Sequence, residues 1–171
     1  MPLPAPPALP LHRSLLCATE ADTEALARRL AACPELAHAL ITLDGDLGTG
    51  KTTFVRHLLR ALGVTGRIKS PTYAVVEPHE APPAPAWPDG LRVSHFDLYR
   101  FSEPREWEDA GFRELLADPG LKLVEWPDKA SGLLPVADLA IALTAMDDDR
   151  RTLDLTAHSL TGAALLEAAC R

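Results

Sequence analysis

Residues 40–63 read LITLDGDLGTGKTTFVRHLLRALG, and this stretch decides the fold. The apolar run HALITL at residues 38–43 is short enough for a strand that is buried on both faces of a sheet. After a glycine-rich turn, apolar residues recur at helical spacing from Phe54 to Leu62, and Gly63 follows where a helix C-cap is favoured. The stretch is therefore predicted to form a strand, a loop and a helix.

The glycine turn matches the phosphate-binding pattern G-x-x-x-x-G-K-S/T at Gly45, Gly50, Lys51 and Thr52. Backbone N–H groups can surround a polyphosphate only where side chains are absent, and the following helix points its positive N-terminal end at the same anion. Lys51 is expected to reach the β- and γ-phosphates, and the Thr52 hydroxyl to ligate Mg²⁺. The predicted nucleotide-binding loop comprises Gly45, Asp46, Leu47, Gly48, Thr49, Gly50, Lys51, Thr52 and Thr53.

The nucleotide base is inferred from motifs that the sequence lacks. A guanine site normally carries N-K-x-D to contact the base, and a D-x-x-G segment usually follows its phosphate loop. Neither pattern follows the loop in this chain. The predicted ligand is therefore ATP, with Mg²⁺ as its metal.

Two acidic residues close predicted strands. Asp97 ends LRVSHFD at residues 91–97, and Glu125 ends LKLVE at residues 121–125. Phosphoryl transfer needs an acid that holds Mg²⁺ from the side opposite Thr52, and a second acid can orient or polarise the attacking water. Either acid alone could simply mark where a strand meets solvent, and the residues do not say which acid takes which role.

The segment SPTY at residues 70–73 lies between the helix of the loop and the next predicted strand. In nucleotide switches this region often supplies a hydroxyl that senses the γ-phosphate, which makes Thr72 a candidate. The alternative is a proline turn that leads into a strand.

The rest of the chain predicts an α/β fold. Residues 19–33 read as a helix with Thr19 as N-cap and Asp22 at the capping-box position. Further strands are predicted for YAVVE, LRVSHFD and LKLVE, with the first two antiparallel, and LAIALTA and RTLDLTA read as a hairpin. Helices are predicted at residues 102–110 and 112–118 and from Thr161 onward. The expected fold is a P-loop NTPase-like three-layer sandwich with a mixed parallel and antiparallel sheet.

The chain length of 171 residues suits one domain. We expect residues 1–14, MPLPAPPALPLHRS, to form a flexible proline-rich leader, and residues 15–171 to form a single P-loop ATPase domain. The leader has no basic stretch ahead of an apolar one, so no signal helix is expected.

Composition limits the partners. No apolar run approaches the roughly 20 residues that cross a bilayer, so no membrane contact is expected. The net charge of −7 disfavours broad binding of nucleic acid. The basic residues Arg56, Arg60, Arg67 and Lys69 cluster in sequence, as a solvated helix face or a nucleic-acid patch. The three cysteines are odd in number and far apart, which indicates buried thiols and a cytoplasmic location.

Four segments in this order, GDLGTGKTT, KSPTY, HFDLYR and VEWP, resemble the TsaE family, also called YjeE. The resemblance runs from about Thr19 to Arg150. It implies a small ATPase that hydrolyses ATP slowly and acts with TsaD and TsaB, which attach threonylcarbamoyl to the adenosine beside the anticodon of tRNAs reading ANN codons. It also implies that tRNA is contacted indirectly, through the complex, and that the transfer itself is not performed by this chain.

The resemblance also implies roles for single residues. Glu125 of VEWP would be the metal-side acid with Thr52, and Asp97 of HFDLYR the second acid at the γ-phosphate, so that Asp97, Glu125 and Lys51 form the catalytic set. Thr72 would lie in the switch-like segment. Glu20 would lie near the adenine, and Arg150 would approach the nucleotide from the other side.

Two alternatives use the same loop. A small P-loop kinase would transfer the γ-phosphate to an acceptor and would want a mobile lid with arginines, for which the sequence offers Arg100, Arg105 and Arg113 but no lid-like insertion. A non-catalytic switch would use ATP only to order SPTY for a partner. Release of phosphate, labelling of an acceptor, or neither, separates the three.

Overall fold

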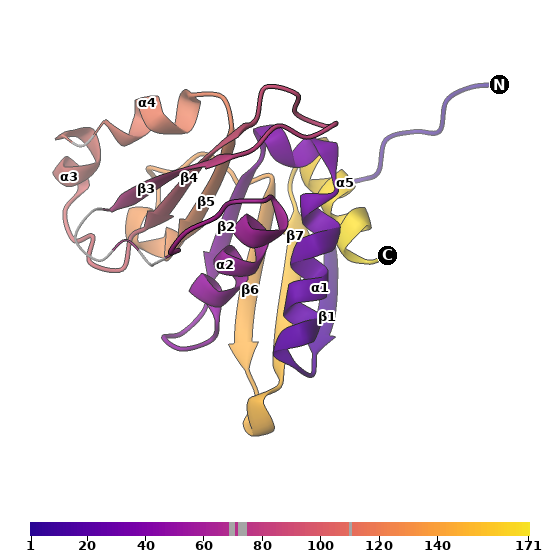
Figure 1. Cartoon of the computed structure of the whole chain (residues 1–171), viewed down its shortest axis with the longest axis horizontal. Coiled ribbons are helices and arrows are strands. Elements are labelled where there is room, and N and C mark those ends of the chain that lie inside the picture. The colour runs from indigo at the N-terminus through magenta and orange to yellow at the C-terminus, as the bar shows by residue number, and fades with distance from the viewer. Residues whose placement is uncertain (69–70, 72–74, 110) are drawn as a thin grey trace.

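A seven-stranded mixed sheet forms the centre of the computed structural model, which describes residues 1–68, 71, 75–109 and 111–171 (Figure 1). Its strand order is β1-β7-β6-β2-β5-β4-β3. The strands are β1 (Leu11–Cys17), β2 (Leu40–Asp44), β3 (Val76–Ala81), β4 (Leu91–Asp97), β5 (Leu121–Glu125), β6 (Leu139–Ala145) and β7 (Arg151–Ala157).

Helices cover the sheet. They are α1 (Glu20–Ala31), α2 (Lys51–Ala61), α3 (Pro104–Asp109), α4 (Phe112–Ala117) and α5 (Leu160–Ala169). Short 3₁₀ helices are η1 (Pro34–His38), η2 (Pro127–Ala130) and η3 (Asp147–Asp149). In the described ranges, no helix combines the length and the apolar character needed to cross a bilayer.

The parallel strands in the middle of the sheet position the site. β2 runs parallel to both β5 and β6, and β4 runs parallel to β5. The register pairs Glu125 with Leu43 on one side and with Asp97 on the other. Parallel strands are covered on both faces, and all five residues of β5 are buried. The carboxyl ends of β2, β4 and β5 therefore meet at one edge of the sheet.

The antiparallel pairs lie toward the two edges. β3 pairs with β4, and β6 forms a hairpin with β7, so both antiparallel pairings are confirmed. The predicted strand YAVVE ended too early at Glu77, because β3 extends to Ala81 where it pairs with Leu91. The predicted leader at residues 1–14 was wrong at its C-terminal end, because β1 begins at Leu11 and pairs with β7 from Leu11–Ala157 onward. The N-terminal group of prolines ends at Pro10, and an edge strand tolerates the exposed polar residues that follow.

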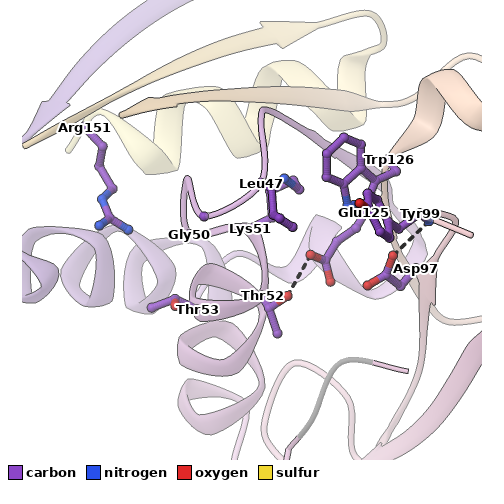
Figure 2. Close-up of a pocket in the computed structure, with 11 residues that line it drawn as sticks. Leu47, Gly50, Lys51, Thr52, Thr53, Asp97, Tyr99, Glu125, Trp126 and Arg151 are labelled. Carbon is purple, nitrogen blue, oxygen red and sulfur yellow. Dashed lines mark hydrogen bonds between the residues drawn. The ribbon is translucent and has the colours of Figure 1, made fainter. Parts of the chain in front are cut away.

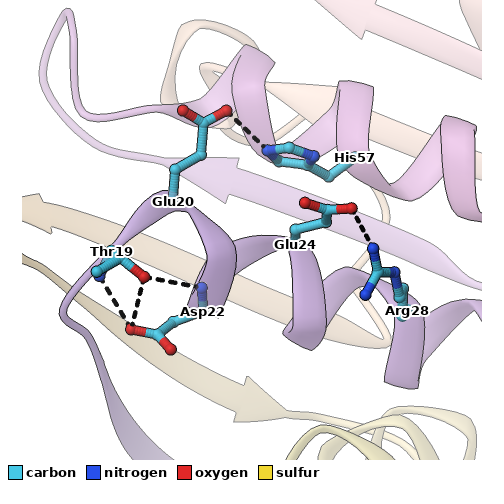
Figure 3. A network of polar contacts seen from close by, with 6 residues as sticks. All are labelled: Thr19, Glu20, Asp22, Glu24, Arg28 and His57. Atoms are coloured by element: carbon cyan, nitrogen blue, oxygen red, sulfur yellow. Dashed lines mark hydrogen bonds and ion pairs between the residues drawn. The ribbon is translucent and has the colours of Figure 1, made fainter.

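The helix boundaries follow the local sequence. At α1 the Thr19 hydroxyl accepts a hydrogen bond from the Asp22 N–H at 3.3 Å, and the Asp22 carboxylate accepts one from the Thr19 N–H at 2.9 Å, which confirms the capping box (Figure 3). α2 begins directly after Gly50, whose φ of 100° is left-handed. Near its C-terminus, the Arg60 guanidinium donates to the Val64 carbonyl at 3.0 Å and to that of Gly66, so this residue of the basic cluster holds the loop that follows α2.

Two apolar clusters lie on opposite faces of the sheet. The larger joins α1, α2 and α5 to one face, which includes Leu43 and Leu123. Side chains alternate along strands, so Phe96 and Val124 point the other way, where they pack with Trp107 of α3. Helices on both faces give the three layers that the sequence predicts.

Candidate functional site

A cavity of about 320 Å³ opens at the carboxyl ends of β2, β4 and β5 (Figure 2). In parallel α/β sheets this edge is where ligands bind. The cavity is lined by Leu47, Gly48, Gly50, Lys51, Thr52, Thr53, Asp97, Tyr99, Glu125, Trp126 and Arg151. It therefore brings the predicted phosphate loop together with both strand-end acids.

The glycines of the loop are required by its geometry. Gly45 has a φ of 148°, and a Cβ atom there would lie 2.5 Å from the Leu143 carbonyl oxygen of β6. Gly50 has a φ of 100°, a left-handed conformation that residues with a Cβ rarely adopt, and the Arg151 guanidinium lies beside it. Thr49 is buried, and its hydroxyl donates to the Asp46 carbonyl at 2.9 Å. Gly45, Asp46 and Thr49 thus shape the loop from behind the lining.

The Lys51 ammonium lies across the mouth of the loop. Its Nζ donates to the Gly45 carbonyl at 2.5 Å and to the Asp46 carbonyl at 2.9 Å, and it lies 4.0 Å from the centre of the Trp126 ring. Burial lowers the pKa of the Lys51 ammonium, and the nearby carboxylates, Glu125 first among them, oppose that shift. The cation therefore sits among backbone carbonyls and acids at the loop.

Thr52, Glu125 and His95 form a chain of hydrogen bonds. The Thr52 hydroxyl donates to Glu125 Oε1 at 2.8 Å, and His95 Nε2 lies 2.5 Å from Glu125 Oε2. Glu125 is only 1 % exposed. A hydroxyl and a carboxylate oxygen side by side are the hard ligands that Mg²⁺ takes, usually one or two from protein with the rest from phosphates and water. Among the described residues no cluster of three or more His, Cys, Asp or Glu side chains could hold a metal by itself.

Asp97 lies next to Glu125 on the neighbouring strand. Its Oδ1 accepts a hydrogen bond from the Tyr99 N–H at 3.0 Å (Figure 2). Burial raises the pKa of the Asp97 carboxyl, the charge of Glu125 adds to that rise, and the Tyr99 N–H opposes it. A carboxyl with a raised pKa is better suited to take up a proton than an ordinary one.

Other predicted residues lie outside this lining. Glu20, expected near an adenine, has its Oε1 3.0 Å from Nε2 of His57 on α2 (Figure 3). Arg150 pairs with Asp148 at 2.8 Å, and the neighbouring Arg151 lines the cavity instead. Adjacent residues at the start of a strand point to opposite sides, so a shift of one position decides which arginine faces the loop. Thr72 lies outside the described residues.

Sequence reasoning gave no definite role to four residues near the cavity. The rings of Tyr99 and Trp126 lie 4.9 Å apart and form a wall. Their signal was their position within two residues of the strand-end acids Asp97 and Glu125. His95 carried a signal as a polar residue on the same face of β4 as the apolar Leu91 and Val93, whereas nothing in the sequence separates Arg151 from Arg150.

Comparisons with known proteins agree with this geometry. The family described as "Threonylcarbamoyl adenosine biosynthesis protein TsaE" matches residues 17–153. The chain is 37% identical, over 129 residues, to the tRNA threonylcarbamoyladenosine biosynthesis protein TsaE of Haemophilus influenzae, covering 75% of this chain and 77% of that protein. It is 36% identical over 137 residues to the TsaE protein of Bacillus subtilis, covering 80% of each.

A solved structure has the same fold. The crystal structure of Bacillus subtilis YdiB superposes with a TM-score of 0.73 at 27% identity, over 96% of this chain and 98% of that one. The family match covers the phosphate loop, both strand-end acids and the start of β7. The resemblance that the four sequence segments indicated is thereby confirmed, and the chain belongs to the TsaE family of threonylcarbamoyl adenosine biosynthesis proteins.

Proposed function

We propose that this protein binds ATP with Mg²⁺, hydrolyses it slowly, and acts with TsaD and TsaB in forming threonylcarbamoyladenosine on tRNA. The observation that carries the ATPase is the convergence on one cavity of a phosphate loop and two strand-end acids. Family membership supports the pathway. The transfer of the threonylcarbamoyl group is assigned to the partners.

The loop binds the triphosphate. Its backbone N–H groups and the N-terminus of α2 face the phosphates, where the helix dipole favours negative charge. Lys51 exchanges the carbonyls of Gly45 and Asp46 for the β- and γ-phosphate oxygens. Arg151 adds a second cation on the side of Gly50.

Thr52 and Glu125 would hold the metal, and Asp97 would position the water. Bound Mg²⁺ would supply positive charge to offset the negative charge that develops during phosphoryl transfer. Asp97 orients a water whose oxygen attacks the γ-phosphorus while the bond to the β–γ bridging oxygen breaks. ADP leaves with that oxygen, and the Asp97 carboxylate accepts the water proton and returns it to solvent or phosphate.

The charge of the protein suits an indirect role at tRNA. With a net charge of −7 the chain is a poor ligand for phosphate backbones, so contact through TsaD and TsaB is favoured over direct binding. Hydrolysis would then reset the complex between rounds of modification.

The test is phosphate release from Mg-ATP by the purified protein, alone and with the TsaB–TsaD pair and tRNA. We expect slow release alone, a changed rate with the pair, and repeated rounds of tRNA modification only when this protein and ATP are present. Binding without release under both conditions would contradict the ATPase and favour a switch. Label transferred from ATP to an acceptor would identify a kinase.

A further inference from the structure

His95 is buried beside Glu125, the acid at the carboxyl end of β5. The side chain lies on β4, has no exposed surface, and contacts Glu125 Oε2 through Nε2 at 2.5 Å. Its other ring nitrogen, Nδ1, has no hydrogen-bond partner in the part of the chain that the structure describes. Most polar atoms of buried side chains have a hydrogen-bond partner. A histidine buried here with one nitrogen unpaired therefore calls for an explanation, and its bond to Glu125 offers one.

The direction of this hydrogen bond follows from the chemistry of its partners. A carboxylate oxygen can only accept, so Nε2 carries the hydrogen and donates it to Oε2. The Thr52 hydroxyl donates to the other oxygen, Oε1. Both carboxylate oxygens of Glu125 thus accept hydrogen bonds, one from β4 and one from α2. A glutamate has three side-chain torsions, and two bonds on different oxygens fix the plane of its carboxyl group.

The fixed plane has a consequence for the metal. With Oε2 occupied by His95, only Oε1 remains directed at Thr52, where the proposed Mg²⁺ would bind. Without the bond from Nε2, the carboxylate could turn Oε2 toward the metal or leave Thr52. Residues behind a metal ligand commonly act in this way, and their loss weakens metal affinity by about 10–100-fold.

We propose that His95 is a positioning residue for the metal-side acid, holding Glu125 so that the Thr52–Glu125 pair is preformed for nucleotide-bound Mg²⁺. The inference rests on the proposed function for the presence of Mg-ATP in the cavity. His95 itself contacts neither nucleotide nor metal in this role.

Two conservative variants test which ring nitrogen matters. In His95→Gln the side-chain amide nitrogen occupies the place of Nε2, and in His95→Asn it occupies the place of Nδ1. The affinity for ATP is measured as a function of Mg²⁺ concentration, and the result is the Mg²⁺ concentration at which half of the increase in affinity is reached. The affinity for ATP in EDTA is the internal reference. We expect His95→Asn to raise the Mg²⁺ requirement by about 10–100-fold and His95→Gln to restore it toward wild type, with metal-free affinity unchanged in both.

His79 on β3 provides the matched control. It lies on the same face of the sheet, two positions along from Glu77, the residue paired with His95, and its Nε2 is also buried without a partner among the described residues. No hydrogen bond joins it to Glu125 in the described structure. His79→Asn is expected to leave the Mg²⁺ requirement unchanged.

Equal Mg²⁺ requirements for the Asn and Gln variants would overturn the role of His95. If wild-type protein binds no ATP at all, the proposed function fails and this inference with it. A second measurement does not depend on a variant that folds: ¹⁵N-resolved spectra of wild-type protein should show a proton on His95 Nε2 that responds to Mg²⁺ added to the ATP complex. A ring without an Nε2 proton would overturn the inference directly.

Discussion

The Thr52 hydroxyl donates to Oε1 of Glu125 at 2.8 Å and so joins the first turn of α2 to the carboxyl end of β5 (Figure 2). The two residues are 73 positions apart in the chain. The contact exists because β2, which leads into the phosphate loop, lies beside β5 in the sheet. It places a hydroxyl and a carboxylate together at the cavity before any ligand is considered.

The two acids are predicted to separate metal binding from water activation. Glu125→Gln keeps the shape of the side chain but removes the charge that holds Mg²⁺, so Mg²⁺-dependent hydrolysis should fall on the order of 100-fold while ATP binding in EDTA is retained. Asp97→Asn should lose hydrolysis, by about 10²–10⁴-fold, and keep Mg-ATP binding. Steady-state phosphate release and calorimetry measure the two effects. Hydrolysis that survives Glu125→Gln, with metal binding lost in Asp97→Asn, would mean that the roles are reversed.

Asp97 is predicted to destabilise the fold at neutral pH. Its pKa is raised above the usual 3.8 in the folded protein, so the folded state holds the proton more tightly than the unfolded state. Stability from this group is therefore present below the unfolded pKa and is lost as the pH rises through the folded pKa. Asn cannot ionise and can still accept the Tyr99 N–H, so Asp97→Asn should be more stable than wild type near neutral pH.

The measurement is urea unfolding of nucleotide-free protein across the acidic to neutral range. The stability difference between Asp97→Asn and wild type should grow as the pH rises. A difference that shrinks toward neutral pH would show that the carboxylate is favoured by its surroundings, contrary to this account.

The loop glycines should differ in what they tolerate. Gly48 has a φ of 82°, and no atom lies within 4 Å of a Cβ built there. Gly48→Ala should therefore lower the free energy of unfolding only by the strain of a left-handed residue, about 1–2 kcal/mol. Gly45→Ala would also press a methyl group against a backbone oxygen of β6 and the Thr49 hydroxyl. Overpacking of this kind costs about 1–3 kcal/mol more. Equal free energies of unfolding for the two variants would contradict the close approach of the loop to β6.

Arg151 is predicted to contribute more than Arg150 to nucleotide binding. Arg151 lines the cavity beside Gly50, whereas Arg150 pairs with Asp148 in the hairpin turn. Loss of a charge-assisted hydrogen bond is worth about 1.5–3 kcal/mol, so Arg151→Ala should weaken ATP binding by roughly 10–100-fold. Arg150→Ala serves as the matched comparison, and a larger loss in Arg150→Ala would restore the prediction made from the sequence.

The sequence predicted the parts of the fold that have local signals. Thr19 and Asp22 are three residues apart and form the capping box that their types favour. The loop at Gly45 to Thr52 was found because its glycines, lysine and threonine are required together by phosphate chemistry. Strand-end acids at Asp97 and Glu125 converge because parallel neighbours end at the same edge of the sheet.

The remaining features depend on contacts between distant segments. Leu11 lies in a strand because it pairs with the edge of β7, and no residue near Leu11 in the sequence indicates that pairing. Arg151 rather than Arg150 faces the loop because the register of β7 against β6 pairs Arg151 with Ala145. The partnership of His95 with Glu125 requires β4 and β5 to be neighbours, although 30 residues separate the two side chains. Such features are set by strand pairing between distant segments, so local sequence patterns could not predict them.

In the proposed function, Lys51 holds Mg-ATP in the cavity over the loop. Calorimetric titration of ATP into wild type, Lys51→Ala and Lys129→Ala, with and without Mg²⁺, tests it most directly, because Lys129 is an exposed lysine on η2. We expect one ATP per chain for wild type and Lys129→Ala, with the affinity increased by Mg²⁺, and binding weakened by roughly 10–100-fold in Lys51→Ala. Wild-type affinity in Lys51→Ala, or no ATP binding by wild type, would contradict it.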